Sequence, residues 1–435
     1  MNRRSFLRTI TLAAGWQRFS RLPLLAQGDD YRALVCVFLY GGNDCNNTVV
    51  PLDAAAFRTY QSSRGTLALS QQSLLPVEAP GGAAYGLHPR LTDVQRLYRQ
   101  GKAAIVANVG VLVRPTSRDE YRRRLVSLPV NLFSHSDQQL QWQSADPSGG
   151  SRSGWGGRTV DQVKASELAA VSLSGVAAFL NSEQVRATLI NPGAPTSLTG
   201  FSNTREQQAR LQAFLEILEL EDGNLLVSAT GLRAREGIRI SQTLTRILTG
   251  SSPFKTAFPA TTLGRQLEAI ARLINARREL AATRQVFFAS LGGWDLHVNL
   301  LASHDPLLGQ LNAALAAFYQ ATEEMGVADR VTAFTASEFG RTLNPNANAG
   351  SDHGWGGHHF VIGGAVKGGT LYGSFPTVAP NSPDDATGRG VWIPTTSLEQ
   401  YGATLAAWFG VPDERLEKVF PNVRNFTPNN LGFLV

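Results

Sequence analysis

Short apolar runs recur along the chain at the length of buried strands. They cover residues 33–39, 103–109, 168–173, 286–291, 331–335 and 360–362. A strand inside a parallel sheet is covered on both faces, so it is apolar throughout instead of alternating between apolar and polar residues. These runs therefore predict strands of one largely parallel sheet.

A second pattern has apolar residues at every third and fourth position, which is typical of amphipathic helices. It covers residues 206–220, 225–248, 263–282 and 307–325. Because strands alternate with helices over much of the chain, we predict an α/β fold with a doubly wound, mostly parallel sheet and helices on both faces. Successive helices over residues 205–283 have no clear strand between them, so we expect a helical insertion or layer there.

The amino terminus departs from both patterns. Arg3 and Arg4 precede Ser5-Phe6-Leu7, and an apolar run over residues 9–15 follows. This order is typical of a twin-arginine export signal, although a basic helix start on a cytosolic protein is the alternative. We therefore expect residues 1–28 to be a leader read by the twin-arginine export machinery. Residues 29–435 would then form a single α/β domain in the periplasm or outside the cell.

The apolar run is far shorter than the ~20 residues that cross a bilayer, so we expect no permanent membrane span. The formal net charge of +6 includes five leader arginines, and removing them leaves a net charge of +1. No basic run has interleaved aromatic residues, so we expect no nucleic-acid partner. The chain has 2 cysteines, which excludes a disulfide framework.

Acidic motifs follow three of the predicted strands directly. Asp44 ends Gly41-Gly42-Asn43-Asp44, Asp295 follows the strand over 286–291, and Glu338 follows the strand over 331–335. Ligands of open α/β sheets gather at the carboxyl ends of the strands, so we expect these carboxylates to lie near one another. Placing three carboxylates together is costly unless a cation compensates them. A turn in which Asp44 merely caps the next element is the alternative.

Most of the 7 histidines stand in or beside these and similar polar motifs. His297 is two residues beyond Asp295, and His353 and His358 follow Asp352 in a glycine-rich loop. Mixed oxygen and nitrogen ligands suit Zn or Mn, so we expect one or two divalent metal ions. A capping aspartate with exposed histidines is the alternative reading of the glycine-rich loop. The predicted ligands are Asp44, His135, Asp295, His297, Glu338, Asp352, His353 and His358.

The motif Ser134-His135-Ser136-Asp137 supplies hydroxyl groups beside a predicted ligand. A serine needs activation before it attacks, and a divalent cation provides it by favouring the alkoxide. We expect Ser134 to be the nucleophile, with Ser136 as second choice, unless the segment only caps the following helix. Arg341 is the candidate for binding the non-reacting oxygens of an anionic substrate.

Several motifs occur in the order of one known family. Besides those above they include Gly86-Leu87-His88-Pro89, Gly154-Trp155-Gly156-Gly157-Arg158 and Ser337-Glu338-Phe339-Gly340-Arg341-Thr342. With these strings the chain resembles domain of unknown function 1501 (DUF1501), a family of twin-arginine-exported bacterial proteins grouped with the alkaline phosphatase and sulfatase superfamily. The resemblance implies an alkaline-phosphatase-like fold and a two-metal hydrolase of phosphate or sulfate esters.

The sequence departs from the superfamily pattern at two places, and both bear on the implied two-metal hydrolase. If Glu338 takes the late carboxylate role, Phe339 stands in place of a histidine, which would weaken or remove one metal. Residues 45–49 lack the Cys/Ser-x-Pro-x-Arg stretch of formylglycine sulfatases. We therefore expect an exported metal-dependent hydrolase acting on a small anionic ester or polymer. The alternative is a non-catalytic periplasmic protein that keeps the fold to bind a ligand or partner.

Overall fold

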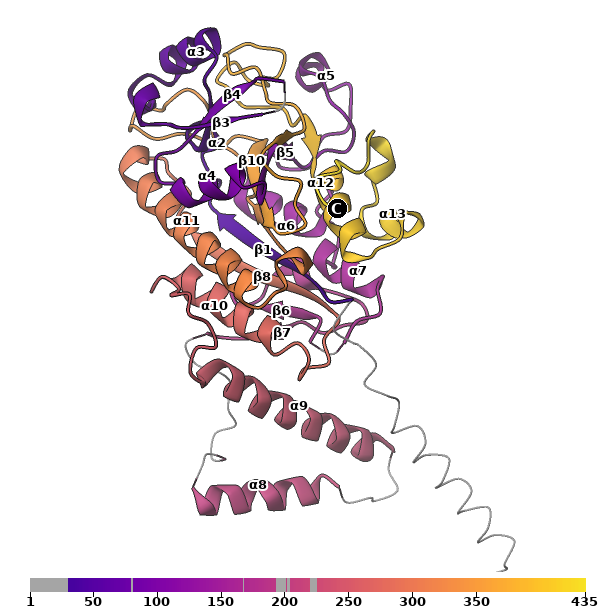
Figure 1. Ribbon diagram of the computed structural model, residues 1–435. Helices are drawn as coiled ribbons and strands as arrows, with labels where there is room; N and C mark the ends of the chain where they lie inside the picture. The colour runs from indigo at the N-terminus through magenta and orange to yellow at the C-terminus, as the bar shows by residue number, and fades with distance from the viewer. Residues whose placement is uncertain (1–29, 80, 167, 193–200, 202–203, 220–224) are drawn as a thin grey trace, which may run out of the picture.

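The fold is built on one central sheet (Figure 1). The computed structural model describes residues 30–79, 81–166, 168–192, 201, 204–219 and 225–435. The strands of the sheet are β1 (Arg32–Tyr40), β5 (Ala103–Gly110), β6 (Ala170–Ser172), β7 (Thr188–Leu189), β8 (Arg284–Gly292), β9 (Val331–Ala336), β10 (Gly357–Gly363), β11 (Leu371–Tyr372) and β12 (Thr396–Ser397). The predicted twin-arginine leader, residues 1–28, lies outside the described residues.

The strand order is β11-β5-β10-β9-β1-β8-β6-β7, with β12 also paired to β5. Strand β10 is antiparallel to its neighbours β5 and β9. The other described pairs of this sheet are parallel. The mostly parallel sheet that the apolar runs predicted is therefore confirmed.

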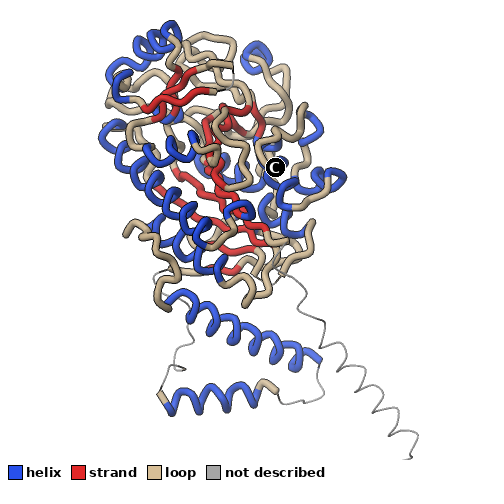
Figure 2. The backbone as a smooth tube through the Cα atoms, viewed as in Figure 1, coloured by secondary structure: helices blue, strands red, loops and turns tan. Residues whose placement is uncertain are grey.

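Helices cover both faces of the sheet (Figures 1 and 2). The helices are α2 (Cys45–Thr48), α3 (Ala54–Arg64), α4 (Thr92–Arg99), α5 (Arg118–Arg123), α6 (His135–Ser144), α7 (Trp155–Asp161), α8 (Arg205–Ile217), α9 (Leu225–Thr249), α10 (Thr262–Asn275), α11 (Leu300–Glu324), α12 (Leu398–Phe409) and α13 (Leu416–Val419). Short 3-10 turns occupy Gly65–Leu67, Gln71–Ser73, Ala178–Leu180, Ala328–Arg330, Asp413–Arg415 and Val423–Asn425.

Strand β1 shows why the apolar runs are continuous. Val35 and Val37 pack into a core with α4, α10 and α11. Cys36 and Phe38 point to the opposite face and pack into a core with α6, α7, α12 and α13. Both sets of side chains are buried because successive residues of a strand face opposite sides. The prediction of a doubly wound sheet is confirmed.

Helix α11 begins earlier than predicted, at Leu300 instead of residue 307, and it runs through Pro306. Proline lacks an N–H group and usually marks the start of a helix, which is why the sequence pattern placed the boundary there. A three-stranded antiparallel sheet was not predicted at all. It comprises β2 (Val49–Pro51), β4 (Ala84–Leu87) and β3 (Leu75–Glu78).

Helices α8 and α9 lie at one end of the molecule, beyond α10 (Figure 1). None of the side chains of α8 is buried. Helix α9 contributes Leu244 to the core beneath α10, whereas α10 itself packs directly against β8. Among the described residues, no helix combines the length and the apolar character that crossing a bilayer requires.

The register of the central strands decides where their loops emerge. Tyr40 pairs with Gly292, and Phe38 pairs with Ala336. Because β1, β8 and β9 are parallel, the segments that follow them leave the sheet at the same edge. These segments carry Asp44, Asp295 and Glu338.

Candidate metal centre

The ends of β1 and β8 touch at Gly41. Its φ is 119°, and a Cβ atom added there would lie 2.3 Å from the backbone nitrogen of Asp295. Only glycine allows both this backbone conformation and this approach. The backbone N–H of Gly41 also donates to Glu338 Oε1 at 2.8 Å, so all three strand ends meet at this point.

Three imidazoles and one carboxylate converge at this edge of the sheet. His297 Nε2 lies 2.9 Å from His353 Nε2 and 3.0 Å from Asp295 Oδ1. The same carboxylate oxygen lies 3.3 Å from His353 Nε2 and 3.4 Å from His135 Nε2. We call His135, Asp295, His297 and His353 the His/Asp cluster.

Each imidazole of the cluster is held from behind through its Nδ1 atom. His135 Nδ1 lies 3.0 Å from Glu338 Oε1, and His353 Nδ1 lies 2.7 Å from the carbonyl oxygen of Phe133. His297 Nδ1 lies 3.4 Å from Asp352 Oδ1. A carbonyl or carboxylate oxygen only accepts, so Nδ1 of His135 and of His353 donates, and Nε2 of each of these two rings faces the cluster. His297 also has a carboxylate beside its Nε2, Asp295 Oδ1 at 3.0 Å.

The ligand atoms of three cluster residues, His135, Asp295 and His353, fit a divalent cation. His135 Nε2 is buried and has no hydrogen-bond partner among the described residues. A tetrahedral ion with bonds of about 2.0–2.1 Å separates its ligand atoms by about 3.4 Å, close to the longer separations found here. Histidine ligands whose second nitrogen is bound to a carboxylate or carbonyl are typical of metal sites. The ligand atoms of His135, Asp295 and His353 all lie within 4.8 Å of one another, and His297 is outside this group.

Electrostatics favour cation binding at Asp295 and His353. Burial disfavours the charged form of Asp295, but the hydrogen bond and charge of Arg341 outweigh it and lower the pKa of the carboxyl to about 2. Burial, aided by the charge of Arg341, lowers the pKa of His353. The hydrogen bond to Glu338 raises the pKa of His135. At neutral pH Asp295 is therefore anionic, and His353 is neutral with a free lone pair.

Glu338 supports the cluster from below. It is fully buried, and its Oε1 accepts from the side chain of Gln139 at 2.9 Å as well as from Gly41 and His135. With three donors on one oxygen, the carboxylate holds the His135 ring in place. In the structure Glu338 orients the ring of His135 and does not itself join the atoms of the His/Asp cluster.

The contacts of Arg341 are mostly with backbone carbonyl oxygens. Its side chain is buried at 1% exposure. The guanidinium donates to the carbonyl oxygens of Gly41, Gly42, Trp294 and Ser351 and to the carboxylate of Asp295. It ties the ends of β1 and β8 together and leaves little donor capacity for a substrate.

Two predicted ligands lie apart from the cluster. Asp44 is buried, caps α2 through the backbone N–H of Asn46 at 3.1 Å, and forms an ion pair with the buried Arg64. His358 lies inside β10, where its Nδ1 accepts from the backbone of Asn108 at 3.0 Å and its ring stacks on Phe375. Burial lowers the pKa of His358 to about 3, so it remains a neutral acceptor.

The remaining predicted residues lie beside the cluster. Ser134 is the N-cap position of α6, and its Oγ donates to Asp137 Oδ2 at 2.5 Å. Ser136 Oγ lies 3.2 Å from Ser134 Oγ. Asp352 contacts His297 on one side and pairs with Arg389 on the other, with Oδ2 2.7 Å from Nη2.

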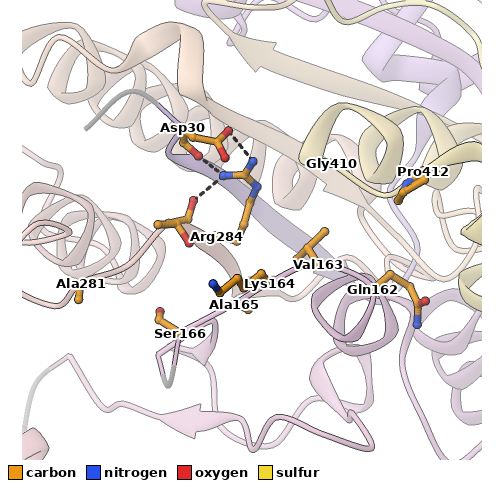
Figure 3. Close-up of a pocket in the computed structure, with 11 residues that line it drawn as sticks. Asp30, Gln162, Val163, Lys164, Ala165, Ser166, Ala281, Arg284, Gly410 and Pro412 are labelled. Carbon is orange, nitrogen blue, oxygen red and sulfur yellow. Dashed lines mark hydrogen bonds and ion pairs between the residues drawn. The ribbon is translucent and has the colours of Figure 1, made fainter. Parts of the chain in front are cut away.

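An open cleft of about 330 Å³ gives access to the cluster. It is lined by Phe133, His297, Thr342, Asp352, His353, Thr387, Arg389 and Val391. A larger cleft of about 510 Å³ lies at the opposite edge of the sheet, where β1 and β8 begin (Figure 3). There Arg284 donates to Asp30 Oδ1 at 2.6 Å, and none of the described residues that line the cleft is a histidine. The smaller cleft is therefore the one that combines open volume with the cluster.

Sequence reasoning missed three contributors to this site. Gln139 is four residues after His135 on α6, so recognising the helix start would have placed it on the same face. Phe133 has a φ of 74°, a conformation uncommon for a residue other than glycine, and it aims its carbonyl oxygen at His353. Arg389 carries no sequence signal, because only the folded loop brings it to the cleft.

The molecule is an α/β protein with a mostly parallel sheet, and it carries a His/Asp cluster at the carboxyl edge of that sheet. The chain belongs to the family described as "Protein of unknown function (DUF1501)", whose model matches residues 31–390. The family membership that the sequence motifs indicated is thereby confirmed. No curated protein is significantly similar in sequence.

Solved structures similar to this chain include the PsFucS1 sulfatase from Pseudoalteromonas sp., with 10% identity, a TM-score of 0.34, and coverage of 91% of this chain and 71% of that chain. Another is Ps i-CgsB, with 8% identity, a TM-score of 0.38, and coverage of 92% and 77%. A third is the phosphonate monoester hydrolase of Agrobacterium radiobacter, with 10% identity, a TM-score of 0.33, and coverage of 88% and 74%. Likenesses at these TM-scores carry no argument about what this chain binds or does.

Proposed function

We propose that the protein is an exported metal-dependent hydrolase of an anionic ester, either a phosphate or a sulfate. The observation that carries the proposal is the convergence of three imidazole nitrogens and one carboxylate oxygen beside an open cleft. Imidazole and carboxylate ligands with access to solvent are characteristic of catalytic zinc sites, in which substrate or water completes the coordination.

One divalent ion accounts for the cluster, with Zn favoured by the imidazole ligands and Mn as the second choice. The donors for a second ion that the superfamily resemblance implies are otherwise engaged. Asp44 is paired with Arg64, and His358 accepts from the backbone of Asn108. We therefore propose that His135, Asp295 and His353 hold a single ion, with His297 beside it, so that one coordination position stays open for substrate or water.

When bound, a divalent cation supplies Lewis acidity toward a phosphoryl or sulfuryl oxygen and toward a nearby hydroxyl or water. The protein's own contribution is to fix the groups around it beforehand. Glu338 orients His135, the carbonyl of Phe133 orients His353, and Arg341 keeps Asp295 ionised. Such preorganisation is typical of sites that stabilise a charged transition state.

Ser134 is the proposed nucleophile. Its hydroxyl donates to Asp137 at 2.5 Å, so a carboxylate is in place to accept the proton. The hydrogen bond from Ser134 lowers the pKa of Asp137, which is therefore ionised at neutral pH. Both chain neighbours of Ser134 contact the cluster or belong to it, since Phe133 binds His353 and His135 is a member. Attack by water is the alternative route.

Metal analysis of the mature protein by plasma mass spectrometry tests the proposal. We expect stoichiometric Zn or Mn in the wild type and its loss in Asp295→Ala and His353→Ala. His358→Asn is the matched control, because an asparagine oxygen can replace the Nδ1 acceptor, and it should keep the metal. Wild type without metal after reconstitution contradicts the proposal. Metal without turnover of any phosphate or sulfate ester favours the non-catalytic binding protein.

We also propose that the twin-arginine machinery exports the protein. The support is the sequence Arg3-Arg4-Ser5-Phe6-Leu7 followed by a short apolar run. Replacing both arginines by lysine keeps the charge but removes the pair that the machinery recognises. We expect the wild type in the periplasmic fraction and the double variant in the cytoplasm. Equal export of the two proteins contradicts this localisation.

A further inference from the structure

Besides two histidines of the cluster, the cleft beside the His/Asp cluster has one arginine and no lysine among its described lining residues, and this arginine is Arg389. The sequence pointed instead to Arg341 for binding the charge of a substrate. Arg341 is buried and donates to several carbonyl oxygens and to Asp295. The side chain of Arg389 is 48% exposed. A substrate anion in the cleft therefore meets Arg389 and not Arg341.

The loop that carries Arg389 is held firmly in place. The fully buried carboxylate of Asp385 accepts from the backbone N–H groups of Thr387 and Val391, both at 3.1 Å. The carbonyl oxygen of Arg389 accepts from the backbone of Asn344 at 3.1 Å, and that of the next residue accepts from Leu343 at 3.0 Å. The backbone under Arg389 is thus anchored on both sides, while its guanidinium faces the cleft.

One carboxylate connects Arg389 to the cluster. Asp352 Oδ2 lies 2.7 Å from Arg389 Nη2, and Asp352 Oδ1 lies 3.4 Å from His297 Nδ1. A guanidinium binds carboxylate, phosphate and sulfate oxygens with the same planar set of donors. Asp352 therefore occupies, in the free protein, donors that an oxyanion of the substrate can take.

We propose that Arg389 is the residue that recognises the oxyanion of the ester substrate, and that Asp352 competes with the substrate for it. The inference deepens the proposed hydrolase function and rests on it only in placing the substrate beside the His/Asp cluster. The ligand class is a tetrahedral oxyanion, phosphate or sulfate, either free or as the head of an ester. Arg389 makes the site select anionic over neutral esters.

Calorimetric titration of the zinc-loaded mature protein with inorganic phosphate and with inorganic sulfate tests the inference. Arg389→Ala should weaken binding of the preferred anion by about tenfold or more, because a charge-assisted contact is lost. The anion affinity of Arg389→Lys should lie between those of the wild type and Arg389→Ala, since lysine keeps the charge but lacks the planar set of guanidinium donors. Asp352→Asn should strengthen binding, because it removes the competing carboxylate.

Arg90→Ala is the matched control. Arg90 also forms an exposed ion pair at 2.7 Å, with Asp305, and it does not line the cleft. The anion affinity of the Arg90→Ala variant should equal that of the wild type. Zinc content and melting temperature are measured for every variant. If the Arg389–Asp352 pair is only structural, both variants lose zinc or stability in the same direction, and the opposite effects on affinity are absent.

Equal anion affinity in the wild type and Arg389→Ala overturns the inference, as does the absence of phosphate and sulfate binding to the zinc-loaded wild type. Failure of the proposed hydrolase function has a different signature. In that case the zinc-loaded wild type binds the anion through Arg389 but hydrolyses neither phosphate nor sulfate esters. The two anions, titrated separately, distinguish a phosphate site from a sulfate site.

Discussion

Glu338 Oε1 lies 3.0 Å from His135 Nδ1 beneath the His/Asp cluster, and it is fully buried. This contact sets the tautomer of His135, because the carboxylate accepts and Nδ1 must donate. The opposite nitrogen is thereby left to face Asp295. Glu338 thus affects the site through His135, although the sequence placed it among the ligands.

Glu338→Gln tests that position. The substitution keeps the size of the side chain and an oxygen that can accept from Gly41, but it removes the charge that stabilises the proton on His135. We expect zinc affinity to fall about 10- to 100-fold, as for other carboxylates behind a histidine ligand. Competition with a chelator measures it. Gln139→Ala, which removes a neutral donor from the same oxygen, should have a smaller effect. Unchanged affinity in Glu338→Gln contradicts the orienting role.

Much of the fold follows from local pattern. The apolar runs that became β1, β8 and β9 are buried on both faces, and parallel pairing then brings their carboxyl ends to one edge. This reasoning brought Asp295 and Glu338 to the same region. It did not predict the antiparallel direction of β10, because a short apolar run carries no information about direction.

The partners of the loop residues were beyond sequence reasoning. Asp44 is paired with Arg64, which reaches it from α3, and Asp352 is paired with Arg389 from a distant loop. Such pairs depend on how loops return to the sheet edge, and neither spacing nor periodicity encodes that path. Hence the sequence indicated which residues lie at the site. It did not indicate which of them belong to the His/Asp cluster and which only orient or pair with other residues.

Asp44→Asn separates a structural aspartate from a ligand. Asparagine is a good N-cap, so α2 keeps its cap, but the buried Arg64 loses its counter-charge. Breaking one partner of a buried ion pair costs about 3–5 kcal/mol in the free energy of unfolding. We expect lower stability in chemical denaturation with metal content unchanged. A folded Asp44→Asn protein that has lost its metal would place Asp44 among the ligands after all.

Ser134→Ala and Ser136→Ala distinguish the two hydroxyls. Ser134 Oγ is 2.5 Å from Asp137 Oδ2, whereas Ser136 Oγ is 3.4 Å from the same oxygen. Only the shorter contact gives efficient proton removal. We expect Ser134→Ala to lower kcat at least 100-fold with full metal content, and Ser136→Ala to lower it only slightly. If both variants keep wild-type kcat on a responsive ester, water is the nucleophile.

Gly41→Ala tests the contact between the ends of β1 and β8. The added methyl group would lie 2.3 Å from the nitrogen of Asp295, at a φ of 119°. Gly81→Ala is a control for the backbone term alone, because Gly81 has a φ of 92° and nothing within 4 Å of its Cβ position. The control should cost about 1–2 kcal/mol in the free energy of unfolding. Gly41→Ala should cost more and should also lower metal affinity; equal effects of the two variants contradict the close-contact argument.

Glu399, away from the site, predicts how stability depends on pH. It is fully buried at the start of α12, and burial raises the pKa of its carboxyl to about 8, only partly offset by backbone and Asn422 contacts. The unfolded chain ionises this group at a pKa of about 4.3. The free energy of unfolding therefore falls as pH rises from about 4.3 to about 8, and levels off above that range.

Glu399→Gln removes this dependence, since an amide does not titrate. We expect its unfolding free energy to change less with pH than that of the wild type, with the difference growing to roughly 4 kcal/mol by pH 7. Urea denaturation at several pH values between 4 and 9 measures both curves. Glu414→Gln is the control, because Glu414 is exposed and should leave the wild-type curve unchanged. Parallel curves for Glu399→Gln and the wild type would mean that Glu399 ionises in the folded protein as easily as in the unfolded chain.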